Sequence, residues 1–259
     1  ITNNLNFPSP ETKIGYWQLS SACEGITKAC IALETPVTGG NVSLYNESKN
    51  QYNEFTPIYP TPVIGMVGTI QNVDNAISSE WKNINDQIWI IGSNSSESTV
   101  GASSYLEYFH GLVTGRPPKI NLQDEKYCQS FLRDAILKNY IISSHDVSDG
   151  GLAVALSECC ILSSKGATIE LEEKNIREDS LLFSEGGSRI IFSINKKEEL
   201  NFLDFVNFKK KDFSQNIYIK KLGFVSKENL KIIVEDKELC NIKVDELTKK
   251  FNNSLTSCF

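Results

Sequence analysis

The sequence predicts an α/β protein with mixed sheets, in which helices and strands alternate along the chain. The continuous apolar run IWIIGS at 88–93 is typical of a strand buried on both faces. Residues 121–140 have the periodicity of a long amphipathic helix. The composition, with 40% hydrophobic and 22% charged residues, is that of a globular protein. A chain of 259 residues suffices for one large domain or two modest ones.

The chain opens with a strand followed by a helix. Residues 1–7, ITNNLNF, read as a short strand, and Pro8 and Pro10 then stop regular structure. Residues 17–34 place apolar or small side chains at helical spacing. We expect Pro36 to end this helix, because a proline disfavours helical geometry in the residue before it.

Two further strands are expected before the polar region that follows. A strand begins at residue 37, and the glycines at 39–40 are expected to break it. A polar insertion covers residues 46–57. The run PTPVIGMVGTI at 60–70 is almost entirely apolar, which predicts a buried strand.

A polar stretch at 71–86 marks a domain boundary, with a first domain at 1–82 and a second at 83–259. The second region predicts helices and strands in alternation. We expect strands at 88–93, 141–145, 167–172, 188–194, 217–225 and 230–236, and helices at 103–112, 121–140, 152–162, 202–210 and 244–253. Asn121 is the expected N-cap of the long helix.

Charge and cysteine content exclude several classes of function. The net charge of -6 argues against nonspecific nucleic-acid binding, which needs clustered Lys and Arg. No apolar run approaches the roughly 20 residues that span a bilayer, so we expect no membrane association. Seven cysteines without a CxxC pattern, and only two histidines, disfavour a zinc site. The scattered cysteines fit a reducing, intracellular compartment.

The first motif, GGNVS within VTGGNVSLYNES, permits two interpretations. Gly39 and Gly40 let the backbone approach a ligand closely, Asn41 offers an oxygen suited to Mg2+, and Ser43 faces the same way as Asn41 on an extended chain. A hairpin turn would use the same Gly-Gly and Gly-Asn pairs.

The second motif, HDVSDGGLAVALSE, opens a helix near Leu152. Asp146, Ser148 and Asp149 precede Gly150 and Gly151, as residues that cap a helix would. The same geometry can hold a ligand on the helix amides, although the two aspartates would repel an anion unless a cation intervened. For His145 we expect a structural role.

The third motif, LFSEGGSRIIFSI, places Ser184 and Glu185 before two glycines and leads into a strand. Alone it reads as a loop between elements. Cys159 and Cys160 lie in an apolar helix and are expected in the core.

Taken together, these segments resemble the C-terminal part of the large subunit of the phosphoribosylformylglycinamidine synthase family. The resemblance extends from Ile1 to about residue 235, and the GNVSLYNE run is its most specific part. The segments that carry it are TNNLNF, GITKACIALETPVTGGNVSLYNES, PTPVIGMVG, SSHDVSDGGLAVALSE and LFSEGGSRIIF.

The resemblance implies an architecture of two tandem units, each similar to aminoimidazole ribonucleotide synthetase. This chain resembles a partial second N-terminal, ATP-binding domain (1–82) followed by a complete second C-terminal domain (83–259). The implied activity is that of a ligase of purine biosynthesis. It converts formylglycinamide ribonucleotide, ATP, glutamine and water to formylglycinamidine ribonucleotide, ADP, phosphate and glutamate, with Mg2+ as cofactor. The implied partners are a glutaminase subunit, a small accessory subunit and the N-terminal half of the synthase.

The resemblance also assigns roles to individual residues. It implies that Gly40 contacts ATP, that Asn41 helps to hold Mg2+ and that Ser43 touches the substrate. Under this resemblance the GGNVS motif is a site. Asn3 stands where many relatives have an ATP-contacting aspartate, so the charge is absent while the hydrogen-bonding shape remains.

The catalytic histidines and the main Mg2+ carboxylates of the family have no counterpart here. We therefore expect no catalytic residue in this chain and no turnover by the chain alone. Because the sequence opens at Ile1 in the middle of a strand pattern, we expect this end to be a cut. Two readings stay open, a piece of the synthase or a non-catalytic assembly module. A third, another ATP-using member of the superfamily such as thiamine-phosphate kinase or selenophosphate synthetase, lacks a counterpart of the GGNVS motif. The expected compartment is the cytoplasm, with a plastid-like organelle as the alternative.

Overall fold

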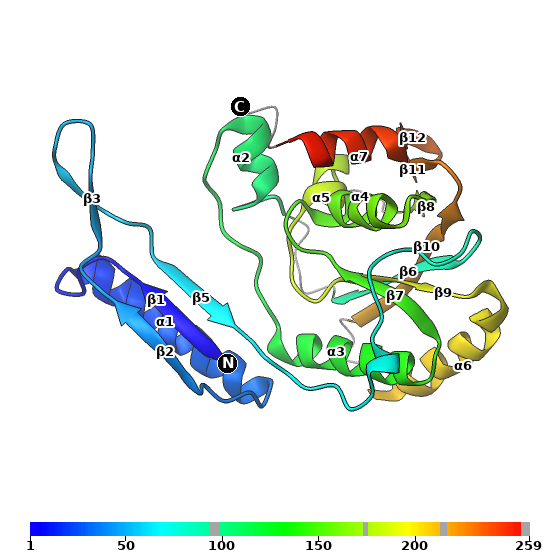
Figure 1. Cartoon of the computed structure of the whole chain (residues 1–259), viewed down its shortest axis with the longest axis horizontal. Helices are drawn as coiled ribbons and strands as arrows, with labels where there is room; N and C mark the ends of the chain where they lie inside the picture. Colours follow the sequence, from blue (N-terminus) through cyan, green and yellow to red (C-terminus); the bar gives the residue numbers. More distant parts are fainter. Residues whose placement is uncertain (94–98, 173–175, 213–216, 255–259) are drawn as a thin grey trace. The chain divides into compact units, whose positions relative to one another are not determined.

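The computed structural model describes residues 1–93, 99–172, 176–212 and 217–254. It divides into two compact units, Ile1–Gln71 and Asn72–Phe259 (Figure 1). Both units combine helices with sheets, so the predicted α/β class is confirmed. The sequence-based domain limits, 1–82 and 83–259, remain predictions.

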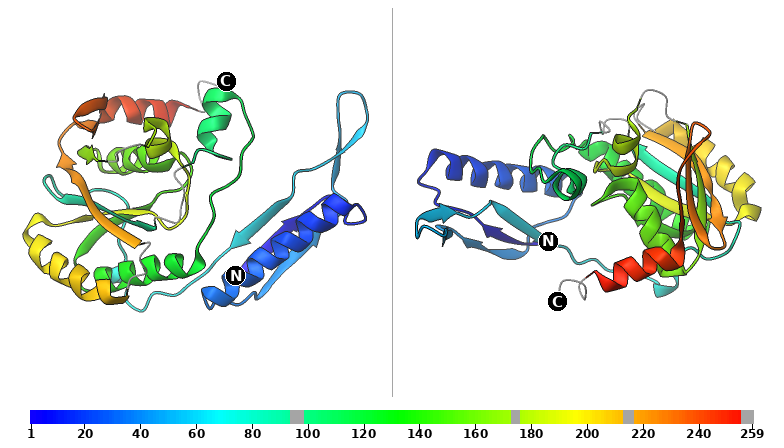
Figure 2. Two further views of the ribbon diagram at one scale, coloured as in Figure 1. Left: turned by 180° about the vertical axis from the view of Figure 1, so that it is seen from behind. Right: turned by 90° about the horizontal axis from the view of Figure 1, so that it is seen from above.

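The first unit is built on a three-stranded sheet in the order β2-β1-β5. Strand β1 (Thr2–Asn6) pairs in parallel with β2 (Gly39–Ser43) and antiparallel with β5 (Thr61–Gly65). Helix α1 (Lys13–Ala32) lies along the sheet (Figure 2). It begins four residues before the predicted start, because the Thr12 hydroxyl accepts from the Gly15 amide as an N-cap.

Two expectations for this unit are wrong. Gly39 and Gly40 do not break a strand; they begin β2 and pair with β1. The apolar run at 60–70 does contain β5, but all five residues of β5 are exposed. An apolar run signals burial only where a neighbouring layer packs closely on it, and here a cavity of about 290 Å³, lined by α1 residues and by Ile64, leaves β5 open.

The polar insertion forms a short hairpin that the sequence pattern did not reveal. Strand β3 (Glu47–Lys49) pairs with β4 (Phe55–Pro57). Asn50 closes the hairpin by accepting from the backbone amides of Tyr52 and Glu54.

The second unit is built on a seven-stranded mixed sheet in the order β12-β11-β8-β10-β6-β9-β7. Strands β8 and β11 are parallel, and the other neighbouring pairs are antiparallel. The strands are β6 (Gln87–Ser93), β7 (Ile141–Asp146), β8 (Gly166–Leu171), β9 (Ile190–Ile194), β10 (Ile217–Ser226), β11 (Asn229–Val234) and β12 (Lys237–Lys243).

Apolar side chains cover both faces of this sheet. On β6, Ile88 and Ile90 belong to the core that includes α4 (Gly151–Ser163), whereas Trp89 and Ile91 belong to the core that includes α3 (Leu122–Leu137) and α6 (Glu199–Lys209). The prediction that IWIIGS is a strand buried on both faces is therefore confirmed, and this burial explains why its polar and apolar residues do not alternate. Figures 1 and 2 show α4, α5 and α7 on one side of the sheet and α3 and α6 on the other.

The predicted helices of this unit are present, and Asn121 caps α3 by accepting from the Gln123 and Asp124 amides. Strand β12 and helix α5 were not predicted. The helices are α2 (Ser104–His110), α3 (Leu122–Leu137), α4 (Gly151–Ser163), α5 (Glu178–Phe183), α6 (Glu199–Lys209) and α7 (Val244–Asn253), with short 3-10 turns at Val73–Asn75, Lys196–Glu198 and Lys210–Asp212.

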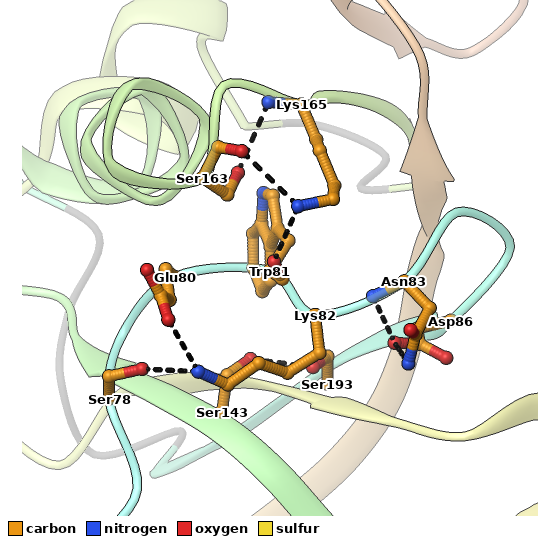
Figure 3. Close-up of polar contacts among 10 residues, drawn as sticks. All are labelled: Ser78, Glu80, Trp81, Lys82, Asn83, Asp86, Ser143, Ser163, Lys165 and Ser193. Atoms are coloured by element: carbon orange, nitrogen blue, oxygen red, sulfur yellow. Dashed lines mark hydrogen bonds and ion pairs between the residues drawn. The ribbon is translucent and has the colours of Figure 1, made fainter.

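Residues 78–86 form a strap that is packed into the second unit. Trp81 is 1% exposed and belongs to its core, and the Ser144 amide donates to the Ser78 carbonyl. Figure 3 shows the Lys165 ammonium donating to the Trp81 carbonyl, at 3.3 Å. Asp86 accepts from the Asn83 amide, and burial raises the pKa of its carboxyl. The polar composition of this stretch reflects its hydrogen bonds rather than a loose linker.

Within the described ranges, no helix is long and apolar enough to cross a membrane. Cys159 and Cys160 lie in the core, as expected, and burial raises the pKa of the Cys160 thiol to about 12. The thiol is therefore protonated and inert at neutral pH.

We expect Trp81→Ala to lower the free energy of unfolding of the second unit by about 3–5 kcal/mol, because it empties a fully buried site. Urea unfolding followed by circular dichroism measures the change. Tyr108→Ala, which truncates a side chain that is 89% exposed, is the matched control and should leave the curve unchanged. Equal curves for Trp81→Ala and the wild type would show that the strap is dispensable.

Candidate functional site

The parallel pairing of β1 and β2 decides which residues of the first motif share a face. Asn4 lies opposite Asn41 and Asn6 lies opposite Ser43. Because side chains alternate along a strand, Asn41 and Ser43 lie on one face of the sheet together with Asn4 and Asn6. We call these four residues the polar face.

Gly40 and Asn3 are a register pair on the opposite face of the same two strands. A Cβ atom at Gly40 would lie 2.0 Å from Asn3 Oδ1 and 2.2 Å from the Asn3 carbonyl oxygen. Gly40 also has φ +156°, a conformation that favours glycine. Glycine is therefore required for β2 to pair with β1, and the structure brings Gly40 and Asn3 together but on the other face from Asn41.

The Asn41 amide is held by two neighbours on the polar face. Its Nδ2 donates to Asn4 Oδ1 at 2.9 Å and to Ser43 Oγ at 3.4 Å. Both hydrogens of the amide group are thus directed at protein acceptors. The Asn41 carbonyl oxygen remains available for a ligand.

The end of the motif is fixed by a second asparagine with a different role. Asn46 Nδ2 donates to the carbonyls of Ser43 and Phe7, and its backbone amide also donates to Phe7. Tyr45 takes φ +58° at this bend. Asn46 therefore closes the ends of β1 and β2 and is structural.

The polar face fits a magnesium ion only in part. The Asn41 carbonyl oxygen and the Ser43 hydroxyl are hard, neutral oxygens of the kind that Mg2+ accepts. No group of three or more His, Cys, Asp or Glu side chains that could hold a metal ion occurs in the described part of the chain. An ion at this face would need anionic oxygens from outside the chain, such as those of a phosphate.

The second motif forms a turn at the edge strand β7. Gly150 and Gly151 both have positive φ, and a Cβ at Gly151 would lie 2.7 Å from the Ser184 carbonyl oxygen. Gly150 is the N-cap of α4 and makes no side-chain cap, so the expected capping by Asp146, Ser148 or Asp149 is wrong. The close approach of the third motif explains Gly151, whereas a Cβ at Gly150 would meet the Val154 side chain.

His145 makes polar contacts with Asp146 and Glu158. Its Nδ1 lies 2.6 Å from the Asp146 carbonyl oxygen and its Nε2 lies 3.2 Å from Glu158 Oε2. The contact with Glu158 ties β7 to α4.

The third motif joins two other segments of the second unit. Glu185 Oε1 accepts from the Ser104 amide at 2.8 Å and from the Gly150 amide at 2.7 Å. Arg189 donates to the carbonyls of Ser184 and Gly186, and burial lowers the pKa of its guanidinium. Beside Glu185 lies a cavity of about 340 Å³, whose lining includes Asp149.

Sequence reasoning missed Asn4, and it placed Glu185 in the third motif without finding its hydrogen-bond partners. Asn4 could have been found from the register, since a strand of five residues with three asparagines has poor strand propensity and invites another explanation. Glu185 had no such signal, because its partners are 35 and 81 residues away.

The comparisons with known proteins identify the family. Residues 1–70 match the family model described as AIR synthase related protein, N-terminal domain. Residues 83–213 match AIR synthase related protein, C-terminal domain. The chain belongs to the AIR synthase related family.

Among curated members of the family, the phosphoribosylformylglycinamidine synthase subunit PurL of Prochlorococcus marinus subsp. pastoris is 80% identical over 259 residues. The alignment covers 100% of this chain and 33% of that protein. The chain therefore spans about a third of the length of the curated relatives it matches.

Solved structures show the same fold. PurL of Thermotoga maritima, complexed with FGAR, superposes with a TM-score of 0.66 at 16% identity, covering 95% of this chain and 39% of that one. A PurLQS structure from Thermotoga maritima gives a TM-score of 0.65 at 14% identity, with coverage of 95% and 38%.

We expect Gly40→Ala to disrupt the pairing of β2 with β1 and to destabilise the first unit by roughly 1–3 kcal/mol, because Cβ would strike Asn3. Gly39→Ala is a matched control in the same strand, since its Cβ meets nothing within 4 Å. Thermal unfolding of both variants tests the difference. Equal loss in both would contradict the steric argument.

We expect Glu185→Leu to lower stability by roughly 1–3 kcal/mol, because the Ser104 and Gly150 amides lose their acceptor. Glu185→Gln, which keeps an acceptor oxygen, should lose less. Hydrogen exchange at those two amides is the measurement. Unchanged protection of the Ser104 and Gly150 amides in Glu185→Leu would contradict the role of Glu185 as their acceptor.

Proposed function

We propose that this chain contributes the polar face and Gly40 to an ATP-dependent ligase, phosphoribosylformylglycinamidine synthase, and that the rest of the active site comes from polypeptide beyond this chain. The observation that carries the proposal is the Asn41 amide. Its nitrogen is engaged by Asn4 and Ser43, and its oxygen is left for a ligand. The 80% identical relative bears the name of this synthase.

The proposed substrates are formylglycinamide ribonucleotide and ATP, with glutamine as the source of ammonia. Names of solved neighbours support this choice, because PurL of Thermotoga maritima is described in complex with ATP and with FGAR. In this proposal Gly40, with Asn3 beside it, lets ATP approach the backbone, Asn41 is a ligand of Mg2+ and Ser43 touches the ribonucleotide.

Each residue has a limited chemical task in this proposal. The Asn41 oxygen binds and orients, and the Ser43 hydroxyl donates or accepts one hydrogen bond. When bound, Mg2+ neutralises phosphate oxygens during phosphoryl transfer. The polar face carries only amides and a hydroxyl, so we assign no general base to this chain.

The proposed partners are the N-terminal half of the synthase, a glutaminase subunit and a small accessory subunit. The PurLQS structure supports an assembly of this kind. The first unit supports it physically, since only Leu5, Phe7, Pro8 and Gly15 are buried among its 71 residues. A unit with so little core needs further polypeptide to complete it. The proposed domain division is a partial N-terminal-type domain at 1–82 and a C-terminal-type domain at 83–259, and the proposed compartment is the cytoplasm, with a plastid-like organelle as the alternative.

A second candidate is a non-catalytic assembly module. It is favoured by the exposed strand β5, where Val63 and Ile64 are 51% and 45% exposed. Such a surface suits association whether or not the site turns over.

We expect the purified chain to make no formylglycinamidine ribonucleotide, even with ammonia supplied. Product should form once the further segment that its relatives carry is added. Product formation from ATP, Mg2+ and the ribonucleotide, followed by chromatography, is the test. In the complete synthase, Asn41→Ala should raise the Mg2+ requirement, whereas Ser21→Ala on the exposed side of α1 should not. Turnover by the lone chain would refute the shared site, and an inactive reconstituted enzyme would favour the assembly module.

A further inference from the structure

We propose that Asn4 is a positioning residue that holds the Asn41 amide with its oxygen turned toward the metal. The inference rests on the proposed function, because it concerns how the Mg2+ ligand of that site is oriented. Asn4 makes no contact with the metal in this proposal and acts only through Asn41.

The register of the sheet brings the two side chains together. Asn4 and Asn41 are direct partners in the parallel pair β1–β2, and both belong to the polar face. Asn41 Nδ2 lies 2.9 Å from Asn4 Oδ1, a normal hydrogen-bond length, and 3.4 Å from Ser43 Oγ. The shorter of the two bonds is therefore the one to Asn4.

The orientation of an asparagine amide matters for a metal ligand. The two ends of the amide are similar in shape, but only the carbonyl oxygen can bind a cation. A reversed Asn41 would present its NH2 group to Mg2+. With Asn4 Oδ1 placed against the nitrogen, a reversal of Asn41 alone would bring two oxygens together, so Asn4 disfavours it, as partners behind a metal ligand commonly do.

Strand stability offers no competing reason for Asn4. Asparagine is depleted in strands, and an exposed face would accept a residue of higher strand propensity. The β1 strand nevertheless holds asparagine at three of its five positions. Asn3 lies against Gly40 on the other face, and Asn4 is the one that bonds to Asn41.

The first test follows the Asn41 side-chain amide by NMR in this chain and needs no activity. We expect its protons to exchange slowly with water, to exchange quickly in Asn4→Leu and to remain protected in Asn4→Asp, since a carboxylate can only accept. Asn201→Leu, an exposed asparagine on α6, is the matched control. A protected amide in Asn4→Leu would overturn the proposal.

The second test measures the Mg2+ concentration for half-maximal activity of the complete synthase. Asn4→Leu should raise it by about 10-fold or more, the usual effect of losing a partner behind a metal ligand. Asn4→Asp should not raise it. In an Asn41→Ala background, Asn4→Leu should add nothing, because the residue through which it acts is gone.

The outcomes separate the two proposals. If Asn41→Ala raises the Mg2+ requirement and Asn4→Leu does not, the positioning role is overturned while the proposed function stands. If Asn41→Ala leaves the requirement unchanged, the metal role in the proposed function fails. The amide exchange of Asn41 then still decides whether Asn4 holds it.

Discussion

The close approach of β2 to β1 is the constraint on which the candidate site depends. A side chain at position 40 would strike Asn3. Because Gly40 has none, residues 2–6 of β1 can pair in parallel with residues 39–43 of β2. That register puts Asn4 opposite Asn41, and strand alternation then turns Asn41 and Ser43 to the same face. A shift by one residue would send both side chains to the face where Asn3 now lies. The glycine thus serves the site through geometry, whether or not it also contacts a ligand.

A comparable constraint organises the loops of the second unit. Gly151 meets the backbone at Ser184, so the turn after β7 and the loop before β9 can touch only if position 151 has no side chain. Glu185 then reaches the Gly150 amide from the same loop and also binds the Ser104 amide. Arg189 donates to the Ser184 and Gly186 carbonyls of the same loop. Two motifs that are separate in sequence therefore form one connected structure.

The sequence could predict what local patterns encode. The strand at 88–93 and the Asn121 cap follow from an apolar run and from a side chain that bonds its own helix start. Helix α5 and strand β12 were not predicted, because they are short or polar and are stabilised by neighbouring elements rather than by a local pattern. The burial expected at 60–70 failed for the converse reason, since β5 has an apolar pattern but no closely packed layer over it within its unit. Register and long-range hydrogen bonds, which decide the roles of Asn4 and Glu185, are not local properties of a sequence.

The absence of carboxylates from the polar face has a chemical consequence. Asn41 and Ser43 contribute oxygens without charge, so they cannot by themselves offset the cost of removing water from Mg2+, which gives up its water reluctantly. Under the proposed function, anionic phosphate oxygens would supply the missing charge, and the affinity of the face for the metal would then depend on the nucleotide. The role left to the protein is orientation, and a neutral amide whose nitrogen is held by Asn4 and Ser43 is suited to that role. Under the proposed function, this division of roles lets a face without acid or base groups contribute to an active site.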